Sequence, residues 1–103
     1  MEKAIEECHK AIELDPEFGN PYNDIGSYLV ELGKPDEAIQ WLEKAKQAKR
    51  YEARCYPYFN LGRIYEMKGK FKEALKEYKQ ALKIEPNYIH ALQAIQYIQA
   101  RLN

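Results

Sequence analysis

Apolar residues recur along the chain at three- and four-residue spacing, which places them on one face of an α-helix. The clearest set begins at Tyr22 and continues through Ile25, Leu29 and Leu32. Comparable sets occur on both sides of it, separated by segments that contain proline or glycine. The spacing predicts an all-α protein with helices over 2–14, 20–32, 35–50, 56–68, 71–84 and 88–101.

Prolines and glycines indicate where several of these helices begin and end. Pro21 and Pro57 lie in predicted first turns, where proline leaves no internal hydrogen bond unmade. Asn20 precedes Pro21, and we expect its side chain to cap the helix. Gly33 and Gly69 follow the ends of the same two helices, because glycine adopts the left-handed conformation there without strain.

Two glycines lie inside the predicted helices rather than at their ends. Gly26 and Gly62 each cost about 1 kcal/mol of helix propensity relative to alanine. Such a cost is best explained by close packing, because any side chain would collide with the neighbouring helix. We expect Ala38 and Ala74 to provide the small facing surface.

The chain repeats itself at fixed offsets. Residues 21–48 align with 57–84 at an offset of 36, and residues 3–18 align with 73–88 at an offset of 70. This pattern is typical of proteins built from stacked helical hairpins. The recurring positions of the most regular copy are Tyr58, Leu61, Gly62, Tyr65, Ala74, Tyr78 and Pro86.

This set of residues resembles the tetratricopeptide repeat, a hairpin of about 34 residues. The resemblance covers essentially the whole chain, and it is weaker in the preceding copy, where Arg50 stands in place of the usual proline. It implies a right-handed α-solenoid of antiparallel helix hairpins, TPR-like, with a concave face lined by the first helix of each repeat. We therefore predict a single domain over 1–103, made of a half repeat (1–18), a repeat with a two-residue insertion (19–54), a repeat (55–88) and a C-terminal capping helix (89–103).

The insertion falls within the basic, aromatic segment 44–59. We expect the helix that begins at Pro35 to run about a turn longer, with a looser turn through 52–55. The lysines and arginines of this segment then belong to a helix end, where cations complement the helix dipole. Because the basic side chains point to several faces and are partly interleaved with acids, we do not expect nucleic-acid binding.

Charge is balanced overall but not along the chain. The protein has 16 basic and 16 acidic residues; residues 1–43 contain eleven acids and three lysines, and residues 44–103 contain thirteen basic and five acidic residues. Opposite ends with charges of −8 and +8 favour head-to-tail self-association. This hypothesis predicts self-association that weakens with salt, detectable by light scattering.

Catalytic and metal-binding patterns are absent from the sequence. Ser27 is the only serine, the histidines are His9 and His90, and Cys8 and Cys55 form no paired metal-ligand motif. We therefore predict a protein that is not an enzyme and uses no cofactor or metal. No apolar run reaches the length of a membrane span, and no signal-peptide core is present, so we expect no membrane association and a cytoplasmic location.

The resemblance also implies which side chains face a ligand, because the first helices of such repeats expose fixed positions to the concave face. A face that combines amides with aromatic rings suits an extended peptide or protein segment. The predicted binding residues are Asn20, Asn23, Ser27, Tyr56, Phe59, Asn60, Arg63, His90, Gln93 and Tyr97.

One ligand class of the resembling family can be tested position by position. Its co-chaperone members bind chaperone C-terminal carboxylates with two lysines, two asparagines and an arginine, and only Asn60 fits that set. Asn23 and His90 stand in place of the lysines, Ser27 in place of the other asparagine and Ala94 in place of the arginine. We therefore predict no carboxylate clamp and no micromolar binding of an EEVD-type peptide.

Two alternatives remain open beside peptide binding. We expect the chain to start with the second helix of a hairpin, whose apolar stripe would be covered on one side only. This suits a structural self-assembly module or an engineered repeat scaffold without a natural ligand.

Trp41 replaces the glutamate found at the equivalent position of the following repeat. We expect it to be half-buried near the convex surface, where a second contact site is the alternative.

Overall fold

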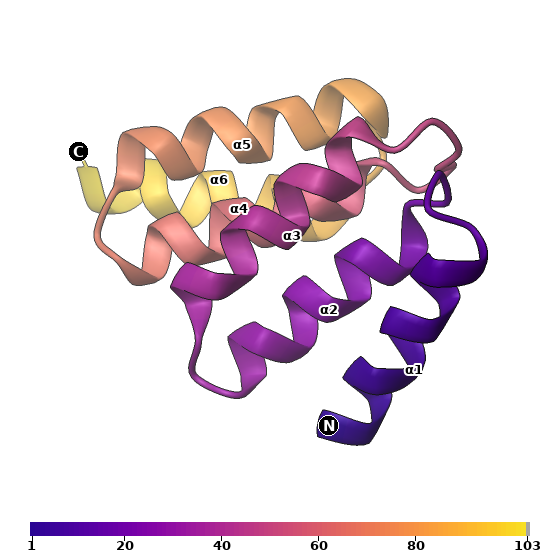
Figure 1. Ribbon diagram of the computed structural model, residues 1–103. Coiled ribbons are helices and arrows are strands. Elements are labelled where there is room, and N and C mark those ends of the chain that lie inside the picture. The colour runs from indigo at the N-terminus through magenta and orange to yellow at the C-terminus, as the bar shows by residue number, and fades with distance from the viewer. Residues whose placement is uncertain (103) are drawn as a thin grey trace.

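The computed structural model describes residues 1–102, and within them the chain forms six α-helices (Figure 1). An isolated parallel β-bridge joins Phe18 to Arg50, and the rest of the described chain is turn and loop. The helices are α1 (Glu2–Leu14), α2 (Asn20–Glu31), α3 (Pro35–Gln47), α4 (Cys55–Met67), α5 (Phe71–Ile84) and α6 (Ile89–Leu102).

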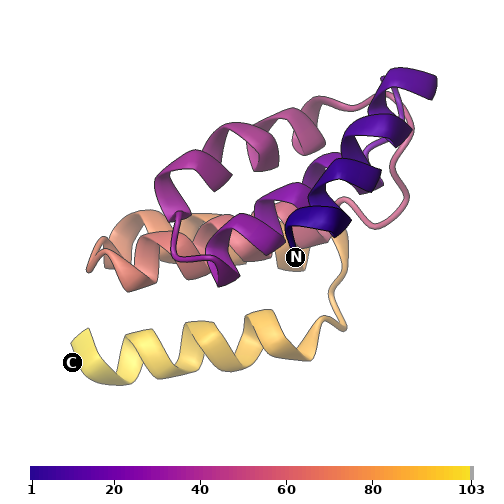
Figure 2. The same cartoon turned by 60° about the horizontal axis from the view of Figure 1, so that its bottom comes forward.

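The helices stack as successive antiparallel hairpins. The closest pairs are α2 with α3 and α4 with α5, while α1 packs on α2, α3 on α4, and α5 on α6. The result is elongated, 47 × 27 × 17 Å, with the two chain ends on opposite sides in Figure 1. Figure 2 shows α6 running along one side of this stack. The predicted all-helical repeat architecture is confirmed.

The turns inside the two hairpins have the same hydrogen-bonded geometry. Gly33 and Gly69 have φ values of 78° and 76°, the left-handed conformation expected of them. Lys34 N–H donates to Leu29 C=O at 2.8 Å, and Lys70 N–H donates to the equivalent carbonyl at the same distance. These are Schellman motifs, which satisfy carbonyl groups at helix ends. The predicted helix ends are therefore correct here.

The start of α2 differs from the prediction. Asn20 is already helical, the capping position is Gly19, and no side chain caps the helix. The main chain itself supplies the contacts, since Tyr22 N–H donates to Gly19 C=O at 3.1 Å. Tyr51 explains the glycine, because a Cβ at Gly19 would lie 2.5 Å from its ring. The predicted asparagine cap was wrong.

The two-residue insertion lengthens a loop and not a helix. The helix expected over 35–50 ends at Gln47, and α4 begins at Cys55. Arg50 forms main-chain hydrogen bonds with the α1–α2 turn: its N–H donates to Glu17 C=O at 3.0 Å, and its C=O accepts from Gly19 N–H at 2.9 Å. Its side chain also pairs with Asp15 at 2.5 Å. These bonds hold the loop against the preceding repeat, which a longer α3 would prevent.

The helical glycines mark close approaches, as predicted, but their partners differ. A Cβ at Gly26 would lie 2.5 Å from Leu42, and a Cβ at Gly62 would lie 2.5 Å from the ring of Tyr78. Ala38 and Ala74 are fully buried nearby without being these nearest atoms. Each glycine thus makes room for a large, fully buried side chain of the facing helix.

Two polar residues on α5 are tied into the packing. Tyr78 is buried, and its hydroxyl donates to Glu66 at 2.8 Å; burial and this carboxylate raise the pKa of the phenol. Glu77 accepts from Lys46 of α3 at 2.8 Å. The Lys46 ammonium also lies 4.3 Å from the Tyr58 ring centroid, which joins adjacent repeats through a mostly buried cation.

Trp41 is half-buried, as expected. Its ring makes an edge-on contact with His9 of α1 at 5.3 Å and stacks with Tyr22 of α2 at 6.2 Å between centroids. The Lys44 ammonium lies 4.4 Å from the ring centroid. Trp41 therefore fills the junction of three helices.

Candidate functional site

The predicted binding residues come from α2, α4 and α6. We call the surface of these three helices that carries the predicted binding residues the groove face. The structure leaves most of its predicted residues accessible but buries two asparagines. Asn20, Tyr56, Arg63, His90, Gln93 and Tyr97 are exposed, Ser27 and Phe59 are half-buried, and Asn23 and Asn60 are buried.

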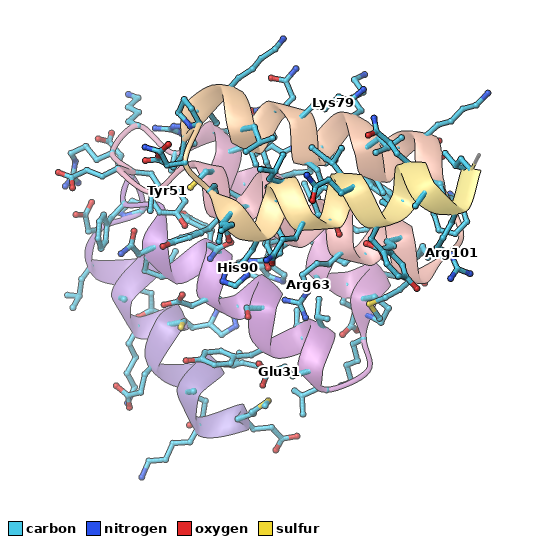
Figure 3. The ribbon with its side chains drawn as sticks, turned by 180° about the vertical axis from the view of Figure 1, so that it is seen from behind. Glu31, Tyr51, Arg63, Lys79, His90 and Arg101 are labelled. Atoms are coloured by element: carbon cyan, nitrogen blue, oxygen red, sulfur yellow. The ribbon has the colours of Figure 1, made fainter. Side chains whose placement is uncertain are left out.

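The buried asparagines form a hydrogen-bonded relay that ends at the surface. Asn60 Nδ2 donates to Asn23 Oδ1 at 3.0 Å, which joins α4 to α2. Arg63 Nη1 then donates to Asn60 Oδ1 at 3.3 Å. Because buried amides are costly unless they are paired, this arrangement stabilises the helix contact and restrains the Arg63 guanidinium. Figure 3 shows Arg63 between α6 and α2.

The relay changes the role expected of Asn60. The residue is 8% exposed, and both the nitrogen and the oxygen of its amide already have side-chain partners. Burial leaves a peptide main chain little access to the one N–H donor and the one acceptor site of this amide that are still unused. On this geometry, Asn23 and Asn60 position other groove residues, and Arg63 is the member of the relay that can reach a ligand.

Aromatic rings form a cluster where α4 meets the start of α6. Phe59 lies 5.1 Å from Tyr88 and 6.4 Å from His90 between ring centroids, and Tyr56 makes an edge-on contact with Tyr88 at 5.6 Å. Burial raises the pKa of Tyr88 to about 12. Tyr88 was not among the predicted residues, although the offset of 70 aligns it with Phe18, the aromatic residue that lies shortly before α2.

A cavity of about 420 Å³ opens beside this cluster. It lies between the loop before α4 and the loop that joins α5 to α6. Its walls combine aromatic and aliphatic side chains with the polar residues Glu52, Glu85 and Asn87. Several of the apolar side chains are unusually exposed for their size, including Tyr56 (47%) and Ile89 (59%). The lining residues used below are Tyr56, Ile84, Tyr88, Ile89 and His90.

A second cavity, of about 330 Å³, lies against Arg63, Glu66 and Met67. The sequence prediction stopped at Arg63 and missed the other two, which follow it at three and four residues. That spacing places them on the same helix face, so periodicity could have found them. Glu66 already accepts the Tyr78 hydroxyl, and Met67 is 60% exposed.

The C-terminal helix adds a polar edge to the groove face. Arg101 Nη1 donates to the Tyr97 hydroxyl at 2.9 Å, and its guanidinium carbon lies 5.3 Å from the Tyr97 ring centroid. Gln93 and Gln96 are exposed on the same helix. These groups can bind uncharged peptide groups.

Within 1–102, no group of three or more His, Cys, Asp or Glu residues is arranged to hold a metal ion. In the same part of the chain, no helix combines the length and apolar character needed to cross a membrane.

Comparison with known proteins identifies the repeat. A family model described as "Tetratricopeptide repeat" matches residues 17–87. The chain is 35% identical over 92 residues to "Protein STIP1 homolog" of Dictyostelium discoideum, covering 84% of this chain and 16% of that protein. It is 29% identical over 85 residues to "Small glutamine-rich tetratricopeptide repeat-containing protein 2" of Mycosarcoma maydis, covering 82% and 23%.

A solved structure agrees with the fold. The crystal structure of MamA superposes with a TM-score of 0.78 at 26% sequence identity, covering 91% of this chain and 54% of that one. The chain thus spans less than a quarter of the two sequence relatives and about half of MamA.

Proposed function

The chain belongs to the tetratricopeptide repeat family, and from this membership we propose that it binds an extended segment of another protein along its groove face and catalyses no reaction. Proteins built from such helical repeats present extended surfaces to partner proteins. Membership therefore supports a protein–protein interaction scaffold. The finer proposal concerns where the partner lies and which side chains contact it.

The observation that carries this proposal is the grouping of exposed aromatic and polar side chains on one face. Tyr56, His90 and Tyr97 alternate there with the donors of Arg63 and Gln93. An extended peptide needs apolar contacts for its side chains and hydrogen-bonding groups for its main chain. The groove face offers both over α4 and α6.

Binding is expected to depend on exposed groove residues. Peptides selected from a random twelve-residue library against the wild-type protein should bind a Tyr56→Ala, His90→Ala, Tyr97→Ala variant at least about tenfold more weakly. Aromatic residues commonly dominate interface energies, and tenfold corresponds to about 1.4 kcal/mol. Fluorescence anisotropy with a labelled selected peptide measures the loss.

A matched control uses exposed residues outside the groove face. The Gln40→Ala, Lys72→Ala, Lys79→Ala variant removes three exposed side chains from α3 and α5. It should bind the same peptide with wild-type affinity. Equal affinity of both triple variants would contradict binding at the groove face, and so would the failure of any peptide to be enriched.

Head-to-tail self-association is the second candidate. The observation in its favour is the charge difference between residues 1–43 and 44–103. One feature of α6 opposes the simplest form of it, in which α6 would pair with α1 of another copy. Gln96 occupies the place that Gly26 and Gly62 hold in α2 and α4, so a second helix could not approach α6 as closely.

The cytoplasmic location predicted from the sequence remains a prediction.

A further inference from the structure

We propose that the groove face selects peptides in which an acidic side chain lies about three residues from an apolar one. Arg63 binds the carboxylate, and the cavity bordered by Tyr56, Tyr88 and His90 holds the apolar side chain. This inference rests on the proposed function, because it names the chemistry of the peptide bound at the same face.

Arg63 places an exposed positive charge on the groove face. Among the residues that the structure describes, no carboxylate lies within ion-pair distance of this guanidinium. Arg50, by contrast, is paired with Asp15 at 2.5 Å. The nearest acidic neighbour along the helix is Glu66, whose oxygen accepts the Tyr78 hydroxyl. Arg63 is therefore an exposed cation whose side-chain partner is a neutral amide.

The guanidinium of Arg63 is held by one hydrogen bond and keeps its other donors free for a ligand. The bond to Asn60 uses one of the five N–H donors of the guanidinium. The remaining donors suit a carboxylate, which arginine binds through two parallel hydrogen bonds. Because Asn60 is itself bonded to the buried Asn23, the arginine is partly ordered before a ligand arrives. Less side-chain entropy is then lost on binding.

The subsite for the apolar side chain of the peptide lies beside the aromatic cluster at the start of α4 and α6. The cavity of about 420 Å³ has Tyr56, Ile84 and Ile89 in its walls, which are 47%, 42% and 59% exposed. Large side chains exposed together at a cavity indicate a surface that a ligand covers. Phe59 packs on Tyr88 and His90 at the border of this cavity, on the side of α4 that leads to Arg63. In Figure 3, His90 and Arg63 lie on the same face.

The distance between the two subsites follows from the geometry of α4. Tyr56 and Arg63 are seven residues apart on α4, so they lie on one face, separated by about 10 Å at 1.5 Å per residue. A peptide in the extended polyproline II conformation rises about 3.1 Å per residue with about three residues per turn, so side chains three positions apart point the same way. A straight segment that contacts both subsites therefore places its acidic and apolar residues about three positions apart.

The test is a selection from a random twelve-residue peptide library with amidated C-termini, carried out on three proteins. The wild type should enrich Asp or Glu about three positions from an aromatic or large aliphatic residue. Arg63→Glu should lose the acidic enrichment and favour Lys or Arg at that position. Lys79→Glu, the same charge reversal on the exposed side of α5, should select the wild-type motif (Figure 3).

Affinity measurements complete the test. A peptide selected by the wild type should bind Arg63→Gln about tenfold more weakly, and replacing its acidic residue by the corresponding amide should cost the wild type a similar factor, because charge-assisted hydrogen bonds are among the strongest. When Arg63→Gln is measured with the amide-substituted peptide, the loss of affinity should be about as large as for either change alone, and not the product of the two. Circular dichroism establishes that the variants fold, as expected for changes at an exposed residue.

The outcomes separate this inference from the proposed function. If peptides are enriched without an acidic preference, or if Arg63→Glu keeps the wild-type preference, the inference is wrong while peptide binding stands. If none of the three proteins enriches any peptide, the proposed function itself is contradicted. Free C-terminal carboxylates are excluded as the source of the signal because the peptides are amidated.

Discussion

Replacing Tyr78 by alanine is expected to lower the free energy of unfolding by about 3–5 kcal/mol, the range observed when large aromatic core residues are truncated. Tyr78 is 1% exposed and lies among residues of three helices. Its ring covers Gly62 of α4, contacts Phe59 at 5.5 Å between centroids, and belongs to the cluster that includes Ile95 and Ile98 of α6. Urea denaturation followed by circular dichroism measures the change.

Two further substitutions separate packing from hydrogen bonding at this position. Tyr78→Phe keeps the ring and loses the bond to the Glu66 carboxylate, so it should cost about 1.5–3 kcal/mol, less than the loss of the ring. Tyr97→Ala removes a tyrosine that is 54% exposed and should change stability by less than about 1 kcal/mol. A loss for Tyr78→Ala no larger than that for Tyr97→Ala would show that Tyr78 is not a core residue.

The substitution Gly62→Ala is expected to destabilise the protein by about 1–3 kcal/mol, although alanine has the higher helix propensity by about 1 kcal/mol. The added Cβ would lie 2.5 Å from Cε1 and 2.6 Å from Cδ1 of Tyr78. A rigid, buried ring cannot move aside cheaply, so α4 and α5 would have to separate. The same denaturation experiment measures the effect.

The sign of this effect should reverse when the ring is absent. In a Tyr78→Ala background the clash is gone, so Gly62→Ala should raise stability by up to about 1 kcal/mol through helix propensity alone. The two residues are thus expected to be strongly coupled in a double-mutant cycle. An equal loss in both backgrounds would mean that something other than the Tyr78 ring requires glycine at this position.

The fold could be predicted from the sequence because each local signal agrees with the repeat. Gly33 and Gly69 end their helices where expected, and the 36-residue offset reproduces both hairpins. The loop after α3 could not be predicted, because its conformation depends on contacts with a distant turn. Arg50 bonds to the main chain of Glu17 and Gly19, and no pattern within residues 44–54 indicates that contact.

The candidate site stays a prediction, and the structure changes its details. The resemblance assigns Asn23, Asn60 and Arg63 to one side of the first helices, where hydrogen bonds join them, yet it cannot tell an exposed amide from a buried one. The buried state of Asn23 and Asn60 follows from the packing of α2 on α4, where each amide satisfies the other. Tyr88 was missed because the resemblance assigns no groove position to the first residue of the predicted helix 88–101; in the structure it lies in the loop just before α6.

The most direct test of peptide binding at the groove face is an NMR titration of the isotope-labelled protein with a library-selected peptide. We expect the largest amide shift changes around Tyr56, Arg63, His90 and Tyr97, with small changes at the exposed positions of α3 and α5. Changes concentrated instead around Gln40, Lys72 and Lys79 would contradict the account, because the peptide would then lie outside the groove face.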